Sequence, residues 1–288
     1  MHIPVLLQEV LQYLDPKPGE FIADGTVDGG GHARAILPHL APGGTFLGVD
    51  WDSNLLDSTR RSVHAPKVRA IWVHGNYAEL DSILGTRQLP KLNGLLLDLG
   101  LSSEQLAGSG RGFSFQTDEP LQMTYDDQSV PLHKLLPQMS EADLTRIIRT
   151  YGEERYAPRI ARAIKSAGKI TTSGELTGII ARAIRPGPGK IHPATRTFQA
   201  LRMYANRELD NLSVLLGELP ELLAPGGRVV IISFHSLEDR LVKQSFRDLA
   251  RSGCAELLTP KPVTASREEV RANPRSRSAK LRALIINH

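Results

Sequence analysis

The sequence predicts an α/β protein with a doubly wound, mainly parallel sheet that is interrupted by a helical insertion. In the first hundred residues, short apolar runs alternate with helical segments, and several runs end at an aspartate. Short, nearly all-apolar strands between helices indicate a parallel sheet covered on both faces. The pattern stops near residue 108 and resumes after residue 206. We therefore expect an α/β domain in two parts, 1–107 and 207–288, with a helical insertion over 108–206.

The first part is expected to contain four strands separated by helices. The strands are predicted at 21–23, 45–49, 68–73 and 95–97, and the helices at 33–40 and 55–63. Pro42, Gly43 and Gly44 end the first of these helices, because proline lacks an N–H donor and glycine favours helix termini.

The insertion is expected to consist of loops and helices. A loop covers most of 108–130, and helices are predicted at 141–150, 155–167 and 174–184, with Ser140 and Ser173 as N-caps. A loop rich in proline and glycine follows at 186–189. The α/β pattern then returns as a helix at 197–223, a strand at 228–233, a helix at 237–251 and a strand at 281–286.

Composition restricts the environment and the partners. The net charge of +4 permits a nucleic acid partner without requiring one. The single cysteine, Cys254, excludes an internal disulfide and a cysteine metal cluster, which suits a reducing compartment. We also expect no metal site. No apolar run approaches the roughly 20 residues of a membrane helix, and the N-terminus does not resemble a secretion signal. These features predict a cytoplasmic protein without membrane contact.

Polar residues follow the predicted strands at the ends where α/β sheets bind ligands. A glycine-rich loop follows Asp24, Asp50 ends the second strand, Tyr77 follows the third, and Asp98 ends the fourth. Glycines let the backbone approach a ligand, the next helix offers N–H groups to an anion, and Asp50 can accept both hydroxyls of a ribose. S-adenosylmethionine (SAM) fits this pattern, but a dinucleotide fits it as well. A helix-capping role for Asp50 and simple packing for Tyr77 remain alternatives.

Long motifs make the assignment more specific. They are 2–7, Gly30-Gly31-His32, 98–103 with Gln105-Leu106, 111–115, 151–155, 192–202 with Asn206, 233–240 and 273–282. On these motifs, which span nearly the whole chain, the sequence resembles the bacterial ribosomal RNA small subunit methyltransferase H family, also called MraW. The resemblance implies a class I SAM-dependent methyltransferase fold with a Rossmann-like sheet, in which the insertion recognises the substrate.

The resemblance also implies a reaction and a cofactor site. The reaction is methyl transfer from SAM to the N4 amine of a cytosine in 16S ribosomal RNA of the small subunit. The family's SAM contacts correspond to Gly30, Gly31, His32, Asp50, Tyr77, Asp98 and Gln105.

The chemistry requires the weakly nucleophilic amine to be aligned with the methyl group and to lose a proton. We predict that Asp98, with Ser102 and Ser103, holds the amine. The alternative is that Asp98 contacts only SAM and that the serines cap a turn. His235 could face the same pocket, but we favour a structural histidine bonded to nearby acids.

Basic residues in the insertion and near the C-terminus predict RNA binding, because arginine can neutralise phosphates. Arg155, Arg159 and Arg162 are expected on one helix face. The full predicted set is Arg155, Arg159, Arg162, Arg196, Arg202, Arg275 and Arg277. Solvated helix faces are the alternative for any single residue. The oligomeric state is open, with a homodimer among the alternatives.

Several residues depart from the family pattern. Asp28 replaces a glycine, and Glu104 replaces a common proline. The segment with Glu119, Gln122 and Thr124 loses one carboxylate and one guanidinium of the family motif. Asp28 is expected to disturb the loop, because non-glycine residues rarely adopt positive φ, and to repel the SAM carboxylate. Three alternatives therefore stay open: a non-catalytic RNA-binding descendant, a methyltransferase with another substrate, and an NAD-linked dehydrogenase.

Overall fold

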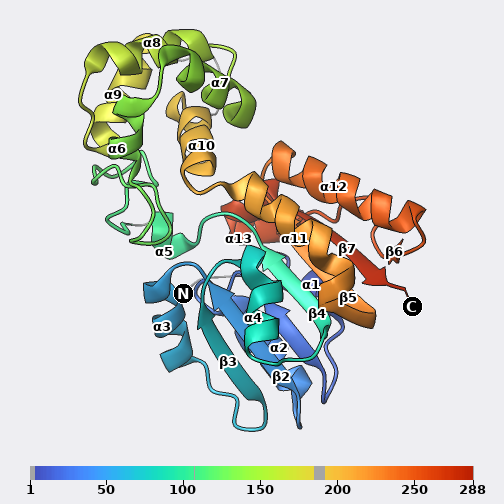
Figure 1. Ribbon diagram of the computed structural model, residues 1–288. Helices are drawn as coiled ribbons and strands as arrows, with labels where there is room; N and C mark the ends of the chain where they lie inside the picture. The colour runs from blue at the N-terminus through green and yellow to red at the C-terminus, as the bar shows by residue number, and fades with distance from the viewer. Residues whose placement is uncertain (1–3, 107, 185–191, 288) are drawn as a thin grey trace. The chain divides into compact units, whose positions relative to one another are not determined.

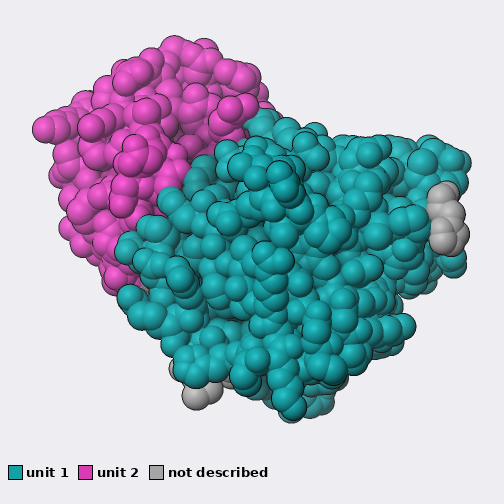
Figure 2. Space-filling view, turned by 60° about the horizontal axis from the view of Figure 1, so that its bottom comes forward, with its two compact units in different colours: residues 1–100, 209–288 teal, residues 101–208 magenta. Residues whose placement is uncertain are grey.

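The structure, a computed structural model, describes residues 4–106, 108–184 and 192–287. The chain divides into two compact units: unit 1 comprises residues 1–100 and 209–288, and unit 2 comprises residues 101–208 (Figure 2). The boundaries predicted from the sequence are 107/108 and 206/207. The first boundary lies earlier because Leu101 and Leu106 pack against the core of unit 2. The start of the first family motif, His2-Ile3, and the loop predicted at 186–189 lie outside the described residues.

Unit 1 is built on a seven-stranded sheet in the order β3-β2-β1-β4-β5-β7-β6 (Figure 1). Neighbours among the first five strands are parallel, whereas β7 pairs antiparallel with β5 and β6. The doubly wound α/β prediction is confirmed. The strands are β1 (Phe21–Asp24), β2 (Thr45–Asp50), β3 (Arg69–His74), β4 (Leu92–Asp98), β5 (Leu223–Ser233), β6 (Ala255–Leu257) and β7 (Lys280–Ile286).

Both faces of this sheet are covered. Successive strand residues point to opposite faces, so Phe21 and Ala23 of β1 enter one buried apolar cluster and Ile22 enters another. The first cluster also holds Leu residues of α4 and α11, and the second holds Val10 and Leu14 of α1. Apolar residues at every position of a strand are therefore explained by burial from two sides.

The helices of unit 1 are short or amphipathic. They are α1 (Leu7–Leu14), α2 (Gly31–Leu40), α3 (Ser53–Ser62), α4 (Leu80–Thr86), α11 (Glu208–Leu222), α12 (Ser236–Arg251) and α13 (Arg267–Ala272). Single 3-10 turns lie at Tyr77–Glu79 and Pro274–Ser278. Among the described residues, no helix is both long enough and apolar enough to cross a membrane.

Unit 2 is helical and has its own core. Its helices are α5 (Ser103–Leu106), α6 (Leu132–Leu135), α7 (Glu141–Gly152), α8 (Ala157–Ala167), α9 (Ser173–Ala183) and α10 (Ala194–Ala205), with a 3-10 turn at Leu136–Gln138. Leu144, Ile148, Ile160, Leu176 and Leu201 are among the residues that fill the core. Within each long helix the core residues recur every three or four positions, which gives the helix one apolar face.

Three local predictions are corrected. The helix expected at 197–223 is two helices, because Arg207 has a φ of 52° and Asn206 bonds through its side chain to the carbonyls of Met123 and Arg202. Helix α9 is capped by Thr172, whose side chain accepts the Glu175 N–H, so Ser173 is its first residue and not its cap.

The third correction concerns the start of α8. This helix begins at Ala157, so Arg155 precedes it and does not share its face with Arg159 and Arg162. By contrast, the N-cap predicted at Ser140 is confirmed, since its side chain accepts the Asp143 N–H.

Candidate active site

The candidate site lies in unit 1, where the strand order reverses between β1 and β4. The chain moves from β1 towards β2 and β3 on one side, and from β4 to β5 on the other. Crevices at such switch points, beyond the carboxyl ends of the strands, are where open α/β sheets bind ligands. Asp24 and Asp98 are the last residues of β1 and β4, and Asp50 is the last residue of β2.

Thr26 joins the ends of β1 and β4. Its hydroxyl accepts the Asp98 N–H at 2.6 Å, and its own N–H donates to Asp24 Oδ1 at 3.1 Å. The hydroxyl also lies 3.5 Å from the same Oδ1, to which it can donate. One residue therefore fixes the backbone of Asp98 and the side chain of Asp24 together.

Several buried polar atoms here lack partners within the described protein. His32 Nε2 lies 3.3 Å from Asp98 Oδ2, within ion-pair distance but without hydrogen-bond geometry. Both ring nitrogens of His32, Asp24 Oδ2 and Asp98 Oδ1 are buried without a hydrogen bond. Buried polar groups are nearly always satisfied, so this set requires a ligand or ordered water.

Burial changes the acidity of Asp24. Removal from solvent raises the pKa of its carboxyl to about 6, although His32 and the bonds from Thr26 act in the opposite direction. An ionised carboxylate without a full set of donors is unfavourable in such a place. A ligand cation beside Asp24 would remove that cost.

Asp50 is held by two backbone donors. Its Oδ2 accepts the Asp28 N–H at 2.7 Å, and its Oδ1 accepts the Asp52 N–H at 2.7 Å. Burial nevertheless raises the pKa of Asp50 to about 7. Each oxygen has a second lone pair, so the side chain can still accept ligand hydroxyls.

Asp28 adopts the left-handed conformation, with a φ of 48°. Aspartate is among the residues that tolerate this region best. The expectation that Asp28 would turn the loop away from such a conformation is therefore wrong. Its N–H instead helps to position Asp50.

The predicted glycines are needed for packing. Gly30 caps α2 with a φ of 73°, and a Cβ there would meet the Thr59 side chain at 2.5 Å. A Cβ at Gly31 would meet Pro4 at 3.1 Å. In this structure the space beside both glycines is occupied by protein. The lack of a side chain at both positions is therefore required by packing within the protein, and contact of these glycines with SAM stays a prediction.

The other predicted residues divide between the two units. Tyr77 follows β3 in unit 1, in the turn capped by Asn76, and packs against the apolar cluster of the sheet. Ser102 and Gln105 belong to unit 2, where the Ser102 hydroxyl accepts the Gln105 N–H and Gln105 Oε1 accepts the Ser102 N–H. Ser102 thus caps a turn, as the alternative proposed. The side chain of Ser103 lies outside the described part of the chain.

His235 is a structural residue within unit 1. Its Nδ1 accepts the Glu238 N–H as the N-cap of α12, and its Nε2 lies 3.1 Å from Glu238 Oε1. This arrangement agrees with the expected histidine bonded to nearby acids.

The predicted RNA-binding arginines are not equivalent. Arg202 forms two hydrogen bonds to Glu208, at 2.8 and 2.9 Å, and only 12% of its side chain is exposed. It is a structural ion pair, which corrects its assignment as an RNA contact. The exposed members of the set are Arg155, Arg159, Arg162, Arg196, Arg275 and Arg277.

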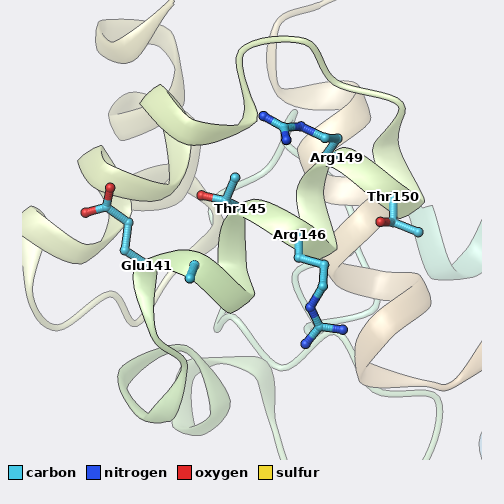
Figure 3. Close-up of a pocket in the computed structure, with 6 residues that line it drawn as sticks. Glu141, Thr145, Arg146, Arg149 and Thr150 are labelled. Atoms are coloured by element: carbon cyan, nitrogen blue, oxygen red, sulfur yellow. The ribbon is translucent and has the colours of Figure 1, made fainter.

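A shallow groove on the exposed side of α7 adds two more arginines in unit 2 (Figure 3). Its lining falls on two rows of residues four apart: Glu141, Thr145 and Arg149 on one, and Ala142, Arg146 and Thr150 on the other. Arg146 pairs with Asp143 at 2.9 Å, and Glu141 pairs with Arg162 at 3.4 Å.

The loop with the unusual family residues is accommodated inside unit 2. Glu119 accepts the Gly112 N–H at 2.8 Å, and Gln122 donates its N–H to the Pro120 carbonyl. Thr124 is buried, and its carbonyl accepts from Arg111.

Sequence reasoning placed Asp24 and Thr26 at the start of the glycine-rich loop but assigned neither of them a role of its own. Asp24 ends a strand as Asp50 and Asp98 do, so the same signal could have assigned it to the site. Thr26 offers no comparable signal, because its bonds to Asp24 and Asp98 depend on the adjacency of β1 and β4.

Comparison with known proteins identifies the family. The family model described as "MraW methylase family" matches residues 1–286. Proteins named "Ribosomal RNA small subunit methyltransferase H" are 47% identical in Thermotoga neapolitana and 45% identical in Syntrophotalea carbinolica. The alignments cover 98% of this chain in both cases, and 95% and 97% of the relatives. The chain therefore belongs to the MraW methylase family, which confirms the family identified from its motifs and the prediction of a SAM-dependent methyltransferase.

Proposed function

We propose that this protein transfers a methyl group from SAM to the N4 amine of a cytosine in 16S ribosomal RNA of the small subunit. The observation that carries the proposal is the set of buried, unpartnered polar atoms at the ends of β1 and β4 in a chain of a methylase family. The relatives' name, which refers to small-subunit ribosomal RNA, supports the substrate.

The residues present fit SAM. Its ammonium group needs acceptors, and Asp24 Oδ2 and Asp98 Oδ1 are buried acceptors without donors. Its carboxylate needs donors, which the N–H groups at the start of α2 and the His32 ring can supply. Asp50 would accept the ribose hydroxyls, and Tyr77 would pack near the adenine. Gly30 and Gly31 shape the start of α2, and Gln105 remains a predicted contact.

Bound SAM supplies an electrophilic methyl group on a positively charged sulfur. The protein's part is to hold the amine in line with that group, and such positioning can contribute roughly 7–11 kcal/mol. We assign Asp98 to accept a hydrogen bond from the amine. This bond orients the nitrogen lone pair, and the carboxylate stabilises the positive charge that develops on the nitrogen as the N–H bond weakens. Ser102 and Ser103 would support the amine, with the Ser102 hydroxyl still able to donate after capping its turn.

Exposed arginines would hold the RNA backbone. Arg159 and Arg162 of α8, together with Arg146 and Arg149 of the α7 groove, provide guanidinium groups within unit 2. Thr145 adds a hydroxyl to the groove, and both donor types suit a phosphodiester. Arg155, Arg196, Arg275 and Arg277 complete the proposed set. Cytoplasmic location is in keeping with this substrate and stays a prediction, as does the absence of a bound metal.

The test is methylation of small ribosomal subunits from a strain that lacks its own enzyme of this family. We expect N4-methylcytidine in the digested 16S RNA, detected by mass spectrometry, and none with Asp98→Ala. Asp248→Asn, an exposed change on α12, serves as the matched control and should retain activity. Folded protein that binds no SAM would favour a non-catalytic RNA-binding protein. A methylated nucleoside other than N4-methylcytidine would refute the proposed target.

A further inference from the structure

A stack of aromatic rings in unit 2 reaches from the core to the surface. Phe198 lies buried on α10, and its ring meets Phe115 edge to face at 5.7 Å between centroids and 84°. Phe115 is half-buried, and His192 lies on it in parallel at 4.5 Å and 9°. His192 is exposed, so the stack ends at the surface on a flat imidazole.

The orientation of this last ring is fixed. The Ala194 N–H donates to His192 Nδ1 at 3.2 Å, at the start of α10. The Nδ1 atom is therefore an acceptor, and the proton of a neutral ring is on Nε2. A ring held by a backbone bond and by a parallel neighbour loses little freedom when another ring packs on it.

The stack also joins residues of two family motifs, and neither Phe115 nor His192 has a role in the proposed reaction. Phe115 ends the motif at 111–115, and His192 begins the motif at 192–202. Arg196, one turn beyond His192, is exposed and donates to the Glu153 carbonyl at 3.2 Å. An exposed flat ring, with an exposed arginine four residues further along the chain, is a combination suited to an unstacked nucleotide, whose base can stack on a ring and whose phosphate can pair with a cation.

We propose that His192 is a stacking platform for an unpaired base of the RNA substrate. The inference rests on the proposed function for the identity of the RNA, and it concerns binding within unit 2. His192 acts as a flat surface and transfers no proton.

Two substitutions separate stacking from helix capping. His192→Asn retains a side-chain acceptor for the Ala194 N–H but removes the ring, whereas His192→Phe retains the ring but removes the acceptor. The binding probe is a single-stranded RNA with the small-subunit target sequence and one 2-aminopurine, whose fluorescence is quenched by stacking. His64→Ala removes an exposed histidine of unit 1 and is the matched control.

We expect His192→Asn to weaken RNA binding roughly 5- to 150-fold, the range for losing one stacked base. When the 2-aminopurine stands at the position of the stacked base, this variant should no longer quench its fluorescence. His192→Phe and His64→Ala should bind and quench as the unsubstituted protein does. If His192→Phe bound RNA weakly and His192→Asn bound it normally, the stacking platform would be overturned in favour of a capping role for His192. Equal binding by all variants would also overturn it. Thermal unfolding of each variant separates lost binding from lost folding. Failure of the proposed function is distinct, because the unsubstituted protein would then not methylate small subunits.

Discussion

Replacing Asp24 with asparagine should separate the stability of the protein from its affinity for SAM. Asparagine keeps an oxygen for the Thr26 N–H but removes the charge from a buried carboxylate whose Oδ2 has no partner. The pKa of Asp24 rises from 3.8 to about 6 on folding. Two pKa units correspond to about 3 kcal/mol, which is the upper limit of the gain in unfolding free energy for the variant at neutral pH without ligand.

The sign of the pH dependence follows from the same shift. Because folding raises this pKa, the folded protein binds the proton more tightly than the unfolded chain does. The stabilising contribution of Asp24 is therefore full below about pH 4 and is lost as the pH rises through about 6. The stability difference between Asp24→Asn and the unsubstituted protein should grow between pH 4 and pH 6.

SAM affinity should change in the opposite direction. Loss of a charged hydrogen bond to the ammonium costs about 1.5–3 kcal/mol, or roughly 10- to 150-fold in Kd. Calorimetric titration of SAM and urea unfolding at pH 5 and pH 7.5 measure the two effects, with Asp248→Asn as the exposed control. Unchanged SAM affinity together with a less stable variant would refute the reasoning, since Asp24 would then be structural only.

Four further predictions concern the same protein. SAM affinity should fall on acidification from pH 7.5 to 5.5, as Asp50, with a pKa of about 7, and then Asp24 become protonated; calorimetry across this range tests it, and a flat profile contradicts it. Thr26→Val should lower the unfolding free energy by about 1–2 kcal/mol and weaken SAM binding, because the Asp98 N–H loses its acceptor, while Thr26→Ser should behave normally. Arg202→Ala should lower the unfolding free energy by about 1.5–3 kcal/mol, because the largely buried Glu208 carboxylate loses two charged hydrogen bonds. Arg159→Ala should instead leave stability unchanged and weaken RNA binding, and the slope of the logarithm of the binding constant against the logarithm of the salt concentration should fall by about 1. If Arg202→Ala weakened RNA binding and Arg159→Ala lowered stability, Arg202 would be the RNA contact and Arg159 the structural residue.

The parts of the fold that could be predicted are those with a local signal. Apolar runs that end at Asp24, Asp50 and Asp98 locate three strand ends, and strand adjacency then places these residues at one edge. The break at Asn206 could not be predicted, because it depends on a bond to the Met123 carbonyl from a distant loop. Arg202 resembled any other arginine, since its burial and its pairing with Glu208 arise only after that break.

The chemistry of the site was less accessible to sequence reasoning than its location. The raised pKa of Asp24 and of Asp50 results from burial, which residue type alone does not reveal. Asp28 was expected to disturb its loop, yet it takes the left-handed conformation of a glycine. A rule based on residue preference gave the wrong result there because aspartate tolerates this conformation better than most residues.

The pairing of β4 with β5 has a consequence for synthesis on the ribosome. All of unit 2 lies between these neighbouring strands in the chain, so β4 is made long before its partner. Until residues 209–288 emerge, the nascent sheet has an apolar, unpaired edge at β4, the kind of edge that promotes aggregation. Unit 2 is complete earlier and is expected to fold first. The length of unit 2 adds little to the free-energy cost of bringing β4 and β5 together, since each doubling of the length of a flexible loop costs only about 0.6 kcal/mol. The time during which the β4 edge stays unpaired is therefore set by the rate of translation. Slower translation of residues 101–208 should increase the requirement for chaperones.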